Sequence, residues 1–190
     1  MCCRYYYDIQ TPDPKLTAII EMMERKYPGR YKAGEIFPGD TVPALIERRG
    51  KIVAIPAVFG FPGFRNGRLL INARAETAEE KRSFAESMRA QRIILPATGF
   101  YEWSRDSDRT KYLFVRESYE VLYLCGLYKI VDGQVRFVIL TRAANESMIE
   151  IHDRMPIIAT EDEVRPYLSD LSSAKAIVTK AAPVLIHELA

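Results

Sequence analysis

The amino-acid sequence predicts an α+β fold, a single domain over residues 1–190 with a curved, mostly antiparallel β core flanked by helices. Short β-rich segments follow one another with turn residues between them, and few helical patterns interrupt them. The chain has 190 residues and is 48% hydrophobic, which suits one compact core. It contains no internal repeat and no low-complexity linker that would divide it.

Two helices are predicted in the N-terminal half. The first spans residues 13–29, where Asp13 can cap the N-terminus, the apolar side chains fall on one stripe, and Pro-Gly ends the pattern. The second is predicted over residues 77–90, because Thr77 and Glu80 have the spacing of a capping box.

The remaining elements are mostly strands, with two short helical segments near the C-terminus. Short β-rich segments with turn residues between them predict strands over residues 51–61, 68–74, 92–103, 111–116, 120–128 and 134–141. Helical patterns follow at 145–151 and 161–168, and the pattern of 174–190 fits either state.

Composition excludes several classes of protein. No run of about 18 apolar residues exists and the N-terminus lacks the layout of a signal peptide, so we expect a cytoplasmic protein without membrane contact. Three cysteines without a CxxC pair predict neither a disulfide framework nor a zinc site, and we expect no cofactor and no metal. The net charge of +2 means that any nucleic-acid surface must be local. We expect a monomer.

The chain starts with "MCCR", which places a cysteine at position 2. Methionine aminopeptidases remove Met1 when the next residue is small. The exposed α-amine of Cys2 would have a pKa of about 7.7–8.0 and be partly neutral at pH 7. It could condense with an aldehyde to an imine, which the adjacent thiol would close to a thiazolidine. Cys3 has an amide nitrogen and cannot react in this way. The alternative is that both cysteines are small apolar residues opening a strand.

Three interior motifs carry side chains suited to catalysis or phosphate binding. "INARAET" points Asn72 and Arg74 to one face of a strand. "GFYEW" sets Glu102 beside Trp103, and an aromatic setting can raise the pKa of a carboxylate toward general acid/base use. "IHDRMP" contains His152, a residue type that moves protons near neutral pH. The alternatives are a solvent-facing strand, an exposed glutamate on a sheet and a structural histidine.

In this order, the motifs resemble the SOS response-associated peptidase (SRAP) family of abasic-site DNA–protein crosslink proteins. They cover most of the chain, from Cys2 to about Pro156. The resemblance implies one SRAP-like domain whose positively charged cleft binds single-stranded DNA containing abasic sites. It also implies that Cys2 forms a thiazolidine with the ring-opened aldehyde and shields the lesion, together with self-processing peptidase activity and lyase activity.

The resemblance also assigns roles to individual positions. Cys2 would be the nucleophile, and Asn72 would be the amide that positions the amine and the sugar. Glu102 would be the acid/base for ring opening, and His152 the acid/base for the sugar hydroxyl or imine. The DNA-binding roles fall on Arg4, Phe64, Arg74, Trp103 and Arg154.

Two features differ from the family pattern. Cys3 stands where the family usually has glycine, so its side chain would crowd the lesion or offer a second thiol. After "APVLIHELA" the family usually continues, so we expect a shorter cleft wall.

Two other functions fit the same residues. An N-terminal-nucleophile cysteine amidase or peptidase would use Cys2 on an amide without any DNA role. A non-catalytic nucleic-acid reader would use the aromatic side chains for stacking and leave Cys2 inert.

Overall fold

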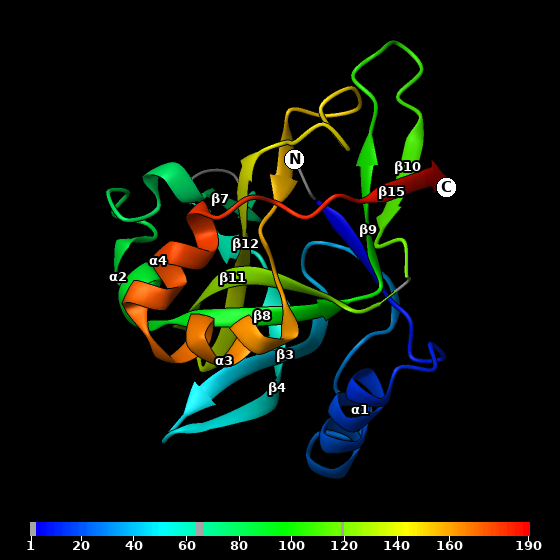
Figure 1. The fold of residues 1–190 in the computed structure, drawn as a ribbon. Coiled ribbons are helices and arrows are strands. Elements are labelled where there is room, and N and C mark those ends of the chain that lie inside the picture. Colours follow the sequence, from blue (N-terminus) through cyan, green and yellow to red (C-terminus); the bar gives the residue numbers. More distant parts are fainter. Residues whose placement is uncertain (1–2, 64–66, 119) are drawn as a thin grey trace.

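Five strands pair in a closed ring and form a small β-barrel at the centre of the molecule (Figure 1). The computed structural model describes residues 3–63, 67–118 and 120–190. The barrel strands, in spatial order, are β12 (Gln134–Ala143), β4 (Lys51–Phe59), β3 (Thr41–Arg48), β8 (Arg92–Ala97) and β11 (Leu122–Val131). Pairing of β11 with β12 closes the ring, and only β12 and β4 run parallel. The predicted mostly antiparallel core is confirmed.

Short strands extend the barrel along β12 and β11. β7 (Asn72–Arg74) runs parallel to β12, and β13 (Arg154–Pro156) runs antiparallel to it. β14 (Ile158–Ala159) pairs with β11, while β5 (Phe61–Pro62) pairs with β6 (Leu69–Leu70). Thr141 of β12 is paired with Arg74 of β7 and also with Pro156 of β13. The "INARAET" and "IHDRMP" segments therefore meet across one strand, although about 80 residues of sequence separate them.

A second, fully antiparallel sheet lies beside the barrel. Its strands, in spatial order, are β15 (Ile186–Leu189), β10 (Lys111–Val115), β9 (Gly99–Trp103), β1 (Arg4–Tyr7) and β2 (Gly34–Ile36). The predicted strand 92–103 continues from β8 of the barrel into β9 of this sheet, and Thr98 between them donates its backbone N–H to Tyr6 O at 2.8 Å. The stacked rings of Phe100 and Phe114 are fully buried beneath this sheet.

In the described part of the chain, four α-helices cover the outside of the sheets. α1 (Pro14–Lys26) confirms the first predicted helix, and its cap Asp13 accepts hydrogen bonds from the backbone of Lys15 and Leu16. α3 (Glu161–Ser169) confirms the helix predicted over 161–168, and α4 (Leu171–Thr179) follows it. Across the described ranges, no helix is long and apolar enough to cross a membrane.

The helix predicted over 77–90 is wrong in its first half. The structure has a 3-10 turn, η1 (Ala75–Thr77), then irregular turns, and an α-helix only at α2 (Ala85–Ala90). The buried side chains explain this. Phe84 and Met88 are four residues apart and share a helix face, whereas buried Ala78 is six residues before Phe84 and would face elsewhere on one continuous helix. Burial of Ala78 and Phe84 together overrides the local capping signal.

The helix predicted over 145–151 is also wrong, because this segment forms turns. Asn145 uses its side chain for local and distant hydrogen bonds: Oδ1 accepts from Ser147, and Nδ2 donates to the carbonyls of Ala182 and Pro183. Such side-chain bonds compete with the regular backbone ladder of a helix. The turns end at Ile151, which places His152 at the entrance to β13.

Candidate functional site

A cavity of about 360 Å³ lies where the N-terminal strand meets the end of β9 and the β12–β13 connection. The pairing of β1 with β9 sets Arg4 opposite Tyr101, so Cys3, one residue earlier, comes beside Glu102, one residue later. The cavity is lined by Cys3, Glu102, Trp103, Ser104, Arg105, Asp106, Arg109 and His152. Two of the four predicted catalytic residues, Glu102 and His152, are therefore in one site.

Glu102 is the buried carboxylate of this cavity. It is 4% exposed, so the alternative of an exposed glutamate on a sheet is wrong. Its Oε1 accepts a hydrogen bond from the backbone N–H of Trp103 at 3.4 Å and lies 4.0 Å from His152 Nε2. Catalytic hydrogen bonds are often long before a substrate binds, so this separation suits a pair that tightens around a substrate.

His152 is held as a neutral imidazole with a defined tautomer. Its Nδ1 accepts the backbone N–H of Arg154 at 3.0 Å, so the ring proton is on Nε2, the nitrogen facing Glu102. Asp153 Oδ1 is also 3.1 Å from Nδ1, a contact that becomes favourable only when that nitrogen is protonated. Burial lowers the pKa of His152 below its usual value, against the opposing charge of Glu102. The neutral form, with the Arg154 hydrogen bond, therefore prevails at pH 7.

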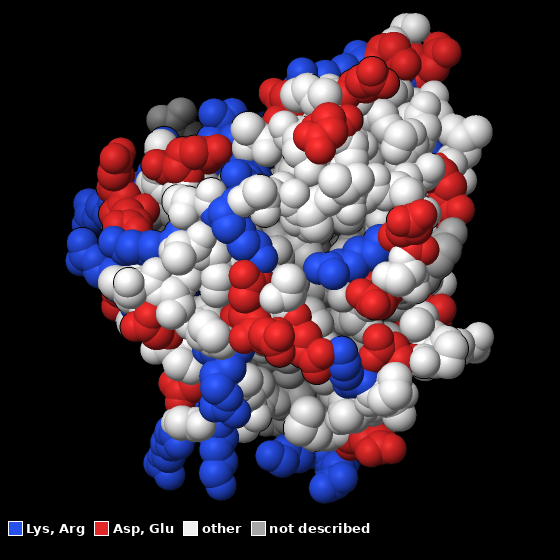
Figure 2. Space-filling model, in the orientation of Figure 1, with Lys and Arg blue, Asp and Glu red and all other residues white. Residues whose placement is uncertain are grey.

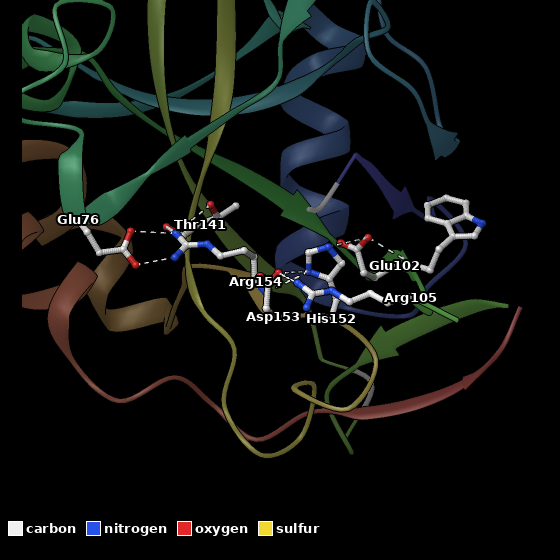
Figure 3. A network of polar contacts seen from close by, with 8 residues as sticks. Glu76, Glu102, Arg105, Thr141, His152, Asp153 and Arg154 are labelled. Carbon is white, nitrogen blue, oxygen red and sulfur yellow. Dashed lines mark hydrogen bonds and ion pairs between the residues drawn. The ribbon is translucent and has the colours of Figure 1, made fainter. Parts of the chain in front are cut away.

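An ion pair ties the β9–β10 loop to the His152 segment. Arg105, from that loop, contacts the carboxylate of Asp153, and this contact holds the pKa of Asp153 below its usual value (Figure 3). Both side chains are about half exposed. The pair joins two segments that line the cavity, so it connects the loop to the segment that carries His152.

Arg154 braces the same segment from the other side. Its guanidinium donates to both oxygens of Glu76, at 2.7 and 2.9 Å, and to the carbonyl of Thr141 at 2.7 Å (Figure 3). Thr141 is fully buried and Arg154 is only 9% exposed. This network links "INARAET" to "IHDRMP" through β12. Whether Arg154 also contacts phosphate stays a prediction.

Sequence reasoning missed Arg105, Asp153 and Glu76. Asp153 and Glu76 were inside the quoted motifs, where an acidic residue next to His152 and another two residues after Arg74 were the available signals. Nothing in the sequence indicated Arg105, because its importance depends on how the β9–β10 loop folds over the site.

Asn72 and Arg74 lie on β7, beside the end of β12. Asn72 is partly buried and Arg74 is exposed, with buried Ala73 between them, as the predicted alternation requires. In the parallel pairing of β7 with β12, Arg74 lies opposite Thr141, whose carbonyl accepts a hydrogen bond from the Arg154 guanidinium. The strand thus brings the predicted amide and an exposed guanidinium to the edge of the braced network.

Arg4 and Trp103 belong to a cluster of cations and rings beside the cavity. Arg4 lies 5.1 Å from the Trp103 ring centroid and 4.3 Å from that of Phe37. Glu35 receives hydrogen bonds from Arg4 at 3.1 Å and from Lys111 at 3.0 Å. The cluster presents flat rings and positive charge on one surface, a combination that suits single-stranded nucleic acid.

Cys2 and Phe64 lie outside the described residues. Cys3 is partly buried, and burial together with the charge of Glu102 raises the pKa of its thiol. This keeps Cys3 protonated at neutral pH and makes it a poor nucleophile. Among the described residues, no group of three or more His, Cys, Asp or Glu side chains is placed to hold a metal ion.

The comparisons of sequence indicate one family. The profile of the SOS response associated peptidase (SRAP) family matches residues 1–188. The abasic site processing protein YedK of Escherichia coli is 30% identical over 187 residues, which is 92% of this chain and 82% of YedK. The abasic site processing protein YoqW of Bacillus subtilis is 38% identical over 110 residues, about half of each chain.

Solved structures share the fold. A protein from Bordetella bronchiseptica superposes over 100% of this chain and 99% of its own with a TM-score of 0.76 at 18% identity. A protein from Bacteroides thetaiotaomicron gives a TM-score of 0.72 at 18% identity, over 99% of this chain and 91% of its own. Because the family profile matches nearly the whole length of the chain and YedK is 30% identical over 92% of it, the chain belongs to the SRAP family.

Proposed function

We propose that this protein processes abasic sites by linking its N-terminal cysteine covalently to single-stranded DNA. The product is a thiazolidine between Cys2, after removal of Met1, and the ring-opened sugar aldehyde. Family membership and the names of its relatives as abasic site processing proteins support the proposal. Removal of Met1 is the step in which a peptidase activity would act on the chain itself.

The position of Cys3 is the observation that carries the proposal. Cys3 lines the cavity together with Glu102 and His152. Consecutive Cα atoms are about 3.8 Å apart, so a chain that reaches the cavity at Cys3 can bring the reactive groups of the preceding residue to it. An amine and a thiol on Cys2 would therefore act beside the buried carboxylate and the neutral imidazole.

The chemistry needs protons at each step. The α-amine nitrogen adds to the aldehyde carbon, and the carbinolamine loses water to form an imine. The Cys2 sulfur then adds to the imine carbon and its proton passes to nitrogen, which completes the thiazolidine with a net loss of one water. Positioning amine and aldehyde together can lower the barrier by roughly 7–11 kcal/mol, and a general acid/base adds about 10²–10⁴-fold.

Glu102 is suited to proton transfer in sugar opening and imine formation, because it is buried and faces the cavity. His152 presents its Nε2–H on the same side, which suits the sugar hydroxyl and the reverse reaction. Asn72 is assigned to hold the amine and the sugar. It lies on β7, next to the end of β12 from which the chain continues to His152.

DNA would be held by cations and rings around the cavity. Arg4 and Trp103 lie together at its edge, and Arg74 is exposed on β7. Phosphate contacts carry no information about the lesion, so these groups should bind undamaged strands as well. Arg154 and Phe64 complete the proposed set.

The test is incubation with a single-stranded oligonucleotide containing one abasic site, followed by a denaturing gel. The proposal expects a shifted band that survives denaturation and is absent with the undamaged strand. Cys2→Ala should abolish this band while reversible binding of DNA is retained. A protein carrying an uncleaved extension before Met1 should also fail, because its amine is blocked.

The same gel separates the competing functions. A nucleic-acid reader would bind both strands without a denaturation-resistant band, and an amidase would bind neither. A normal yield of adduct from Cys2→Ala, or from the blocked N-terminus, contradicts the assignment of Cys2.

A further inference from the structure

A second groove lies at the end of the molecule opposite the cavity. The cavity is formed by the end of β9 and the β12–β13 connection, which lie at the top of Figure 1, whereas the β3–β4 turn and α1 lie at the bottom. The groove has a volume of about 440 Å³ and is lined by Tyr27, Arg30, Thr41, Arg48, Ile55, Pro56, Val58, Gly133, Gln134 and Val135. It shares no lining residue with the cavity.

Positive charge concentrates around this groove. Residues 24–31, at the end of α1, and residues 47–51, at the β3–β4 turn, together contain six Lys or Arg and two Glu, a net charge of +4. The whole chain has +2, so the rest of it has −2. The β11–β12 turn, residues 132–136, adds one Asp and one Arg and leaves the balance unchanged. Figure 2 shows Lys and Arg side chains projecting along this lower edge.

These cations are available for an external anion. All six are exposed, and within the described part of the chain none lies at ion-pair distance from a carboxylate. The two local glutamates are already engaged, Glu24 with the Tyr31 hydroxyl at 2.7 Å and Glu47 with the backbone N–H of Gly50. By contrast, Arg4, Arg105 and Arg154 near the cavity each pair with an acidic side chain.

We propose that this groove is a second binding site for single-stranded nucleic acid, separate from the cavity that receives the lesion. Arg30 and Arg48 both line the groove and can contact successive phosphates. Tyr27 offers a ring on which a base can stack, and the apolar floor and the Gln134 amide suit a base edge. An anionic lipid surface would use the charges alone, whereas a concave groove with a ring and an amide suits a nucleotide strand.

The test uses an undamaged, fluorescently labelled single-stranded oligonucleotide, so it does not depend on crosslinking by Cys2. Anisotropy titrations over a series of salt concentrations compare the wild type with Arg30→Ala/Arg48→Ala. The logarithm of the association constant decreases linearly with the logarithm of the salt concentration. The steepness of this decrease should be smaller by about 0.7 for each phosphate that is no longer neutralised, so by about 1.4 in the double variant. Arg82→Ala/Arg89→Ala removes two other exposed cations and should leave the slope unchanged.

A photocrosslinking arm places the strand. With 5-iododeoxyuridine in the oligonucleotide, irradiation should yield an adduct in the peptide that contains Tyr27. Adducts confined to peptides of the cavity, or a slope in Arg30→Ala/Arg48→Ala equal to that of the wild type, overturn the proposal. So does binding of phosphatidylglycerol vesicles that depends on Arg30 and Arg48 while the oligonucleotide binds independently of them.

Discussion

Replacement of Arg154 by methionine should destabilise the fold substantially and disturb the site through the position of His152. Methionine keeps much of the apolar stem but removes the guanidinium that reaches Glu76 and Thr141. The backbone N–H of Arg154 also holds His152 Nδ1, so movement of this residue would release the imidazole. The free energy of unfolding and the reactivity of the site should therefore fall together.

The magnitude follows from the burial of each partner. Thr141 is fully buried, and its carbonyl would lose a charged donor at 2.7 Å, which costs about 1–3 kcal/mol. Glu76 has a side chain that is 50% exposed and would return to water, so its pair with Arg154 contributes about 1 kcal/mol or less. The expected total for Arg154→Met is about 1–4 kcal/mol, which corresponds to a fall in Tm of roughly 2–16 °C for a chain of this size.

Glu76→Gln is the matched control. It keeps the bond from Arg154 to Thr141 and should cost about 1 kcal/mol or less at pH 7. The hydrogen bond from Arg154 lowers the pKa of Glu76 in the folded protein. The contribution of ionised Glu76 to the free energy of unfolding is therefore fully present above its pKa in the unfolded chain, about 4.3. It is lost as the pH falls through its lower pKa in the folded protein. The difference between wild type and Glu76→Gln should narrow below pH 4.3.

Urea unfolding followed by circular dichroism at pH 7 and at lower pH measures these values. A cost below about 0.5 kcal/mol for Arg154→Met would refute the bracing role, as it would place this substitution among ordinary surface changes. An equal cost for Glu76→Gln and Arg154→Met would show that the buried bond to Thr141 contributes nothing.

Other predictions concern the reaction and its pH dependence. Glu102→Gln should slow adduct formation by about 10²-fold or more with unchanged DNA affinity, measured as a time course; formation at the wild-type rate removes Glu102 from the mechanism. His152→Ala should slow release of the purified adduct chased with an aldehyde-reactive trap, and release at the wild-type rate would exclude it. Cys3→Gly should be tolerated in the gel assay, and a loss equal to that of Cys2→Ala would give Cys3 a role. Because burial lowers the pKa of His152, the free energy of unfolding should decline as the pH falls below about 6.5, the pKa of histidine in the unfolded chain. His152→Gln should reduce that decline in urea unfolding, and an unchanged decline would contradict the burial of a neutral imidazole.

Local patterns predicted the fold class and most strands, because short β-rich apolar segments are separated by turn residues. The closure of the barrel was not predictable, since it depends on β12 pairing with β4 across more than 70 residues of sequence. The helix over 77–90 failed for the same reason: the burial of Ala78 and Phe84 is decided by the rest of the molecule.

For the site, the sequence likewise indicated which residues take part but not how they are arranged. The identity of Glu102 and His152 was visible from their motifs, and the structure lines one cavity with both. Their environment was not visible, because the burial of Glu102 and the tautomer of His152 depend on packing and on the backbone of Arg154. The Arg105–Asp153 pair joins segments that no local signal connects.

The intact mass of the protein–DNA adduct tests the central claim most directly. After reaction with an oligonucleotide carrying one abasic site, the adduct should weigh as much as the protein without Met1 plus the oligonucleotide, less one water. Digestion should then place the DNA on the N-terminal peptide at Cys2. An adduct that retains Met1, or one that maps to a lysine or to Cys3, would contradict the mechanism.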